Sequence, residues 1–129
     1  MATILIIDDN DELCSMLVEL LEGEGYETAV ARNGEIGVRA FTQLRPDLVI
    51  TDMVMPDSDG VEAIRRIRSI DPAARIVAIS GGSMIGYDYY LRVAKSLGAY
   101  EVVAKPFDLD EFVGIVQRCL PDTPAAGTS

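Results

Sequence analysis

The sequence predicts an α/β fold, a doubly wound five-stranded parallel sheet with helices on both faces. Short, unbroken apolar runs, typical of strands buried on both faces, alternate with segments whose apolar residues recur at helical spacing. With 129 residues, of which 49% are hydrophobic, the chain is long enough for one domain. The right-handed connections of such folds favour the strand order 2-1-3-4-5.

Two strand–helix units fill the first third of the chain. An apolar strand over residues 3–7 precedes a helix that ends at Gly23 and Gly25. A second strand over residues 26–31 leads through the turn at Asn33-Gly34 into the second helix. The residues expected on the buried faces are Leu13, Met16, Leu17, Leu20 and Leu21 in the first helix and Ile36, Ala40, Phe41 and Leu44 in the second.

Three further units complete the predicted sheet. The expected strands end at Asp52, at Ser80 and before Lys105. Helices are expected after Gly60, over residues 87–97 and after Phe107, and the first of them ends at Asp71-Pro72. The residues expected to be buried are Val61, Ile64 and Ile67 in the third helix and Leu109, Phe112, Val113 and Val116 in the last. We expect residues 1–120 to form the domain and residues 121–129, which are rich in Pro, Ala, Gly and Thr, to be a disordered tail.

Composition excludes several classes of function. The formal charge of -10 argues against binding to nucleic acid or to anionic membranes. No His is present, which excludes imidazole chemistry from this chain, and the two cysteines, Cys14 and Cys119, form no zinc motif. Reduced thiols indicate a cytoplasmic protein, and the apolar run at residues 4–7 is too short for a signal peptide or a membrane span.

The predicted strand order brings acidic residues from two strands together. Strands one and three are neighbours in that order, so Asp8, Asp9 and Asp52 should share one crevice at the carboxyl ends of the strands. Ser80 and Lys105 should flank this crevice. Crowded carboxylates suit a hard cation such as Mg²⁺, and a lysine suits a phosphate-like group. The sequence therefore predicts a phosphoryl-transfer site.

These motifs, in this order, resemble the receiver domains of two-component response regulators, which have a flavodoxin-like (βα)5 fold. The residues that carry the resemblance are Ile6-Ile7-Asp8-Asp9, Asp52 with Met55-Pro56 and Asp59-Gly60, Ser80-Gly81, Gly98-Ala99 and Lys105-Pro106-Phe107. Together they span residues 3 to about 120. Each motif alone is weak, and their combination is specific.

The resemblance implies a role for each site residue. Asp52 would accept a phosphoryl group from a phosphohistidine on a histidine kinase or phosphotransfer protein. Asp9 would bind Mg²⁺ directly, Asp8 mainly from the outer shell, and Asp52 and the Val54 carbonyl would complete the set. Lys105 would contact the phosphoryl group, and Ser80 would move toward it.

The resemblance also implies how the domain would signal. Like other receivers, the chain would be no enzyme beyond its own phosphorylation and dephosphorylation. It would pass the signal to a separate downstream protein, and it would be a monomer or a weak phosphorylation-dependent dimer.

Two features depart from the family pattern. Val102 stands three residues before Lys105, where receivers usually have Tyr or Phe, and Tyr100 is on the same strand face and could substitute for it. The glycine-containing loop after Ser80 is longer than the typical one by a few residues. Both departures concern the surface that would change on phosphorylation.

Other interpretations of the same residues remain open. Asp8-Asp9 could cap the next helix, and Lys105 could be a solvated strand-end lysine. A Mg²⁺-dependent phosphohydrolase of the haloacid-dehalogenase type also uses a strand-end aspartate, and Asp9-Asn10-Asp11 matches its Asp-x-Asp start, although Leu13 stands where its Thr is expected. A flavin carrier of the same fold would need hydroxyl groups and amides in the first loop, where this chain has carboxylates.

Overall fold

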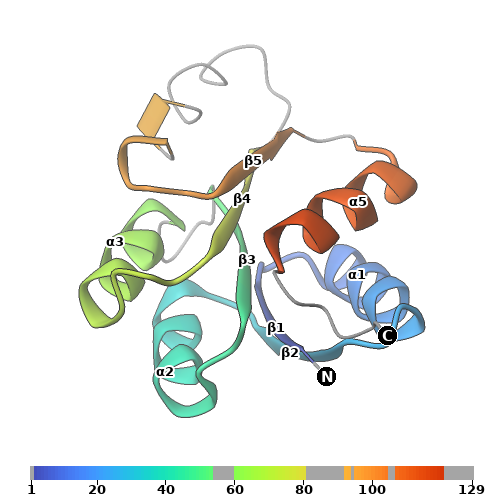
Figure 1. Cartoon of the computed structure of the whole chain (residues 1–129). Helices are drawn as coiled ribbons and strands as arrows, with labels where there is room; N and C mark the ends of the chain where they lie inside the picture. The colour runs from blue at the N-terminus through green and yellow to red at the C-terminus, as the bar shows by residue number, and fades with distance from the viewer. Residues whose placement is uncertain (1, 54–59, 81–91, 94, 105–106, 121–129) are drawn as a thin grey trace.

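The computed structural model describes residues 2–53, 60–80, 92–93, 95–104 and 107–120 (Figure 1). It confirms a five-stranded parallel sheet with the order β2-β1-β3-β4-β5. The strands are β1 (Thr3–Ile7), β2 (Glu27–Ala31), β3 (Leu48–Asp52), β4 (Ile76–Ser80) and β5 (Glu101–Ala104). The helices are α1 (Asp11–Gly23), α2 (Gly34–Leu44), α3 (Gly60–Ile70) and α5 (Leu109–Cys119). Of the expected fourth helix over residues 87–97, residues 92, 93, 95, 96 and 97 are described; the first four are helical and Leu97 lies in a turn. The predicted tail, residues 121–129, lies outside the described residues.

Two apolar clusters, one on each face of the sheet, hold the helices in place. Ile4 and Ile6 of β1 face a cluster that includes Leu17 of α1 and Phe112 of α5. On the opposite face the alternate residues Leu5 and Ile7 join the cluster that packs against α2 and α3 (Figure 1). Because the strand has apolar neighbours on both sides, its residues form a continuous apolar run.

Four helix residues that were predicted to lie on buried faces are exposed. Met16 of α1 is 37% exposed, Ile36 and Leu44 of α2 are 45% and 47% exposed, and Leu109 is 38% exposed. In α2 the buried face passes instead through Gly37. Because Gly37 has no side chain, the helix can lie close to β1: a Cβ at this position would be 2.5 Å from Ile7 Cδ1. Ile36 lies outside this buried face, which Gly34, Gly37, Val38 and Phe41 form. Leu109 is the first residue of α5, where the side chain is only partly covered.

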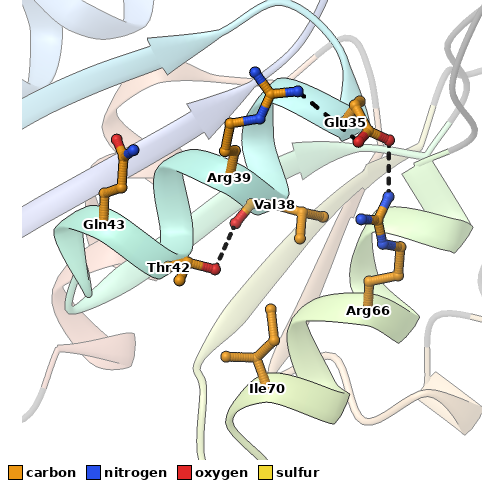
Figure 2. A pocket seen from close by; sticks show the side chains of 7 residues that line it. All are labelled: Glu35, Val38, Arg39, Thr42, Gln43, Arg66 and Ile70. Carbon is orange, nitrogen blue, oxygen red and sulfur yellow. Dashed lines mark hydrogen bonds and ion pairs between the residues drawn. The ribbon is translucent and has the colours of Figure 1, made fainter.

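The second and third helices pack side by side and enclose a shallow surface hollow (Figure 2). Its volume is about 350 Å³, and Val38 and Ile70 line it from the two helices. Glu35 accepts from Arg66 at 3.0 Å across the hollow and lies 4.0 Å from Arg39 on its own helix. Exposed ion pairs of this kind contribute little to stability, so apolar packing is the main interaction between α2 and α3.

The start of α3 lies directly against the end of β3. A Cβ built on Gly60 would lie 1.8 Å from the carbonyl oxygen of Asp52, which is far inside van der Waals contact. Only glycine fits at this position unless the backbone shifts. The Asp-Gly motif that the sequence analysis identified at Asp59-Gly60 therefore has a steric explanation at Gly60, and α3 is fixed to the strand that carries Asp52.

We predict opposite effects of adding a methyl group at two helical glycines. Gly60→Ala should lower the free energy of unfolding by about 2 kcal/mol, because backbone atoms must move to accept the side chain. Gly114→Ala in α5 should raise it by about 0.5–1 kcal/mol, because nothing lies within 4 Å of the added atom. Urea unfolding followed by circular dichroism measures both. Equal stability of Gly60→Ala and the wild type would contradict the close approach of α3 to β3.

Candidate functional site

Three carboxylates meet at the carboxyl ends of β1 and β3. Ile7 pairs with Thr51, so the next residue of each chain segment, Asp8 and Asp52, lies at the same level of the sheet. Asp8, Asp9 and Asp52 each place one carboxylate oxygen within 4.8 Å of the others. Asp8 and Asp52 are buried, at 1% and 5% exposure, and Asp9 is exposed. The structure thus brings together the three acidic residues predicted from the sequence.

Asp8 is oriented by several hydrogen bonds. Its N–H donates to the Ala31 carbonyl at 3.0 Å, and its Oδ1 accepts from the N–H of Asn10 at 2.9 Å. The thiol of Cys14 donates to the Asp8 carbonyl at 3.4 Å. Asn10 in turn caps α1, because its side chain accepts from the N–H of Leu13 at 3.0 Å. Asn10 was not predicted as a cap from the sequence, although an Asn followed by acidic residues at the start of a helical apolar pattern is a recognised capping signal.

Asp52 is positioned by the sheet. It pairs with Ile79 of β4, and the N–H of the following residue, Met53, donates to the Ile79 carbonyl at 2.8 Å. The Thr51 hydroxyl lies 3.2 Å from the Asp52 carbonyl and donates to it. Because β3 is the middle strand of five, Asp52 has the carboxylates of β1 on one side and the end of β4 on the other.

The remaining predicted site residues are only partly described. Ser80 is buried at the end of β4 and pairs with Ala104 of β5. Lys105 follows Ala104 directly in the chain, but it lies outside the described residues, as do Val54 and the loop from residue 81. The structure therefore places Ser80 beside the end of β3 and leaves the positions of Lys105 and Val54 as predictions.

Tyr100 does not stand where a switch aromatic is expected. Its N–H donates to the Ile76 carbonyl at 2.8 Å, at the start of β4, and its ring lies 5.1 Å from the guanidinium carbon of Arg75. Ser80 ends the same strand, four residues further on, which corresponds to about 13 Å along it. Tyr100 precedes β5, and strand alternation alone does not give the position of a residue along the strand direction. Tyr100, which is 51% exposed, is too far from Ser80 to replace the aromatic residue missing at Val102.

Both cysteines are buried and free of disulfides, as the sequence analysis expected. Burial, together with the smaller effect of the nearby Asp8 charge, raises the pKa of the Cys14 thiol to about 11. Burial likewise raises the pKa of Cys119 to about 11. Since both thiols stay protonated at neutral pH, neither contributes a thiolate ligand or nucleophile.

The chemistry of the donor set fits Mg²⁺. The three residues offer only oxygen atoms, which are the ligands that hard divalent cations prefer. Two of the three carboxylates are buried, where mutual repulsion and desolvation are most costly without a compensating cation. An arrangement of this kind favours binding of a hard cation together with a phosphate-like anion.

Fold and site together define the class, a doubly wound α/β domain with an acidic cluster at the carboxyl ends of its two adjacent central strands. Residues 4–117 match the family described as response regulator receiver domain. The chain belongs to this family, the phosphoacceptor signalling domains of two-component systems. Receiver domains are signalling modules and not metabolic enzymes. No helix in the described part of the chain is long and apolar enough to cross a membrane.

Individual relatives cover nearly the whole chain. Sporulation initiation phosphotransferase F of Bacillus subtilis is 37% identical over 118 residues, which are 92% of this chain and 93% of that protein. The regulatory protein AtoC of Escherichia coli is also 37% identical, over 91% of this chain but only 25% of its own length. A crystal structure of the response regulator TrrA of Thermotoga maritima with Mg(2+)-BeF matches with a TM-score of 0.81 and 35% identity, covering 93% of this chain and 100% of that one.

We predict that Asp9→Ala loses most of the Mg²⁺ affinity, about tenfold or more by calorimetric titration, because the cation loses a charged ligand. In the absence of metal this variant should unfold at the same temperature as the wild type or higher, since one of three mutually repelling carboxylates is gone. Glu12→Ala, which removes the same charge from an exposed position in α1, is the control and should bind Mg²⁺ like the wild type. A metal-free Asp9→Ala that melts well below the wild type would show that Asp9 has a structural role.

Proposed function

We propose that Asp52 is the phosphoacceptor and takes a phosphoryl group from a phosphohistidine on a histidine kinase or phosphotransfer protein. The observation that carries this proposal is the group of three carboxylates at the ends of β1 and β3. Asp8, Asp9, Asp52 and the Val54 carbonyl would hold Mg²⁺, which supplies neutralisation of negative charge as the phosphoryl group approaches. In the reaction a carboxylate oxygen of Asp52 bonds to phosphorus, and the bond from phosphorus to the histidine nitrogen breaks.

The positions of the three carboxylates favour Asp52 as the nucleophile. One oxygen of Asp8 accepts the N–H of Asn10 at 2.9 Å, which commits that carboxylate to a supporting role. Asp9 is exposed and lies at the rim of the group. Asp52 is on the central strand, between the acidic end of β1 and the hydroxyl-bearing end of β4 at Ser80. A phosphoryl group on Asp52 would therefore lie between the carboxylates that would hold Mg²⁺ and the Ser80 hydroxyl.

Two further residues would bind the phosphoryl group. Ser80 ends β4 and pairs with Ala104, and Lys105 follows that residue in the chain. We propose that the lysine ammonium and the Ser80 hydroxyl bind phosphoryl oxygens. Phosphorylation would thereby change the surface near β4 and β5, which a separate downstream protein would recognise. We also propose a cytoplasmic location and a monomer or weak phosphorylation-dependent dimer.

The structure disfavours the phosphohydrolase alternative. That mechanism needs Asp9 as nucleophile with Asp11 as a partner carboxylate beside it. Asp11 instead lies in the first turn of α1, where its Oδ1 is 2.8 Å from Arg32 Nη1, and it is not part of the carboxylate group. The match of Asp9-Asn10-Asp11 to an Asp-x-Asp start is therefore a feature of sequence alone.

We predict that incubation with Mg²⁺ and acetyl phosphate adds one phosphoryl group to the intact mass of the wild type. Asp52→Asn should abolish this addition, because the amide oxygen is a poor nucleophile. Asp11→Asn is the matched control and should be phosphorylated like the wild type. Peptide mapping after trapping with borohydride identifies the modified aspartate. Labelling of Asp52→Asn to the wild-type extent would contradict the assignment.

A further inference from the structure

The guanidinium of Arg68, near the end of α3, binds the carbonyl groups of two neighbouring segments. Its Nε donates to the Leu97 carbonyl at 3.2 Å and its Nη1 to the Pro72 carbonyl at 2.6 Å. Its Nη2 donates to the Gly98 carbonyl. The other two arginines of α3 pair with carboxylates, Arg65 with Glu62 and Arg66 with Glu35. Arg68 is thus the arginine of α3 that links this helix to residues 97–98.

Residues 97–98 form a turn directly after the helical residues 95 and 96. The N–H of Leu97 donates to the Val93 carbonyl at 2.9 Å, and the N–H of Gly98 to the Lys95 carbonyl at 3.0 Å. Gly98 has a φ of 88°, and a Cβ there would lie 3.1 Å from Arg68 Nε. Glycine therefore provides both the left-handed turn and the space for the guanidinium. Arg68 satisfies carbonyl groups that a helix end leaves without intrahelical partners, and its charge complements the helix dipole.

The opposite end of α3 lies against the proposed phosphoacceptor. Gly60, the first residue of α3, is so close to the Asp52 carbonyl that no Cβ fits between them. The helix has 11 residues and a length of about 16 Å. Ala63, Ile64 and Ile67 anchor it in the core along this length. A shift of the Asp52 backbone toward α3 would therefore press directly on the first residue of this helix.

We propose that α3 couples Asp52 to residues 97–100, and that the Arg68 contacts hold these residues in the unphosphorylated arrangement. This inference rests on the proposed function, since it requires phosphorylation of Asp52. The two states are Arg68 bound to the Leu97 and Gly98 carbonyls, and Arg68 released from them. Binding of a phosphoryl group favours release, so by linkage the loss of the Arg68 contacts favours the phosphorylated arrangement. Arg68 is a positioning residue in this scheme.

The test compares binding of beryllofluoride with Mg²⁺, a mimic of the phosphoryl group, to the wild type, Arg68→Met and Arg65→Met. Arg68→Met keeps much of the side-chain length and loses the donors, and Arg65→Met removes the same charge from the same helix. We expect Arg68→Met to bind about fivefold more tightly than the wild type by calorimetry. We expect Arg65→Met to bind like the wild type. Arg68→Lys, which keeps the charge, should lie between wild type and Arg68→Met and serves if Arg68→Met folds poorly.

Hydrogen exchange supplies a second readout that a loss of stability alone would not reproduce. In the wild type, the mimic should increase amide exchange at residues 97–100, and free Arg68→Met should already show that increase there and not in β1 or β3. Equal or weaker binding of the mimic by both Arg68 variants would overturn the coupling while leaving the proposed function intact. A wild type that does not bind the mimic would overturn the proposed function and this inference with it.

Discussion

The repulsion among three carboxylates at one end of the sheet is the constraint on which the rest of this structure depends. Asp8 and Asp52 are buried and Asp9 is close to both, an arrangement that opposes folding unless a cation or hydrogen-bond donors compensate for it. The backbone N–H of Asn10 donates to Asp8 Oδ1. The carboxylate oxygens of Asp8, Asp9 and Asp52 form a group suited to Mg²⁺. A site that is unfavourable when empty gains most from binding a cation and then a phosphoryl group.

The apolar core provides the stability that tolerates this site. Strands β1, β3 and β4 are buried on both faces, and their pairing fixes the levels at which the acidic residues and Ser80 end. Gly60 extends this rigid framework to α3. The same contacts that hold Asp52 in place therefore connect it to the far end of α3, where Arg68 binds residues 97–98.

Sequence patterns predicted the sheet order and the acidic group because both follow from local rules. Apolar runs locate the strands, the common order of a five-stranded doubly wound sheet makes the first and third strands neighbours, and the ends of neighbouring strands then meet. The sequence could not place Tyr100, because alternation defines a face without defining a level along the strand. It also missed Gly60 and Arg68 as contacts, since these depend on how closely elements pack and, for Arg68, join residues about 30 positions apart. Ile36 was assigned to the buried face of α2 because apolar spacing does not reveal that this face passes through Gly37. Leu44 continues the same face but is exposed as the last residue of the helix.

The account is tested most directly by the dependence of thermal unfolding on Mg²⁺ concentration. If the three carboxylates form one cation site, Mg²⁺ should raise the melting temperature saturably, with about 2.7 kcal/mol of added stability at a hundredfold excess over the dissociation constant. NaCl at matched ionic strength should produce a much smaller rise, because screening is weak for buried charges. A melting temperature that responds to Mg²⁺ and NaCl alike would contradict the central claim that this acidic group is a specific cation site.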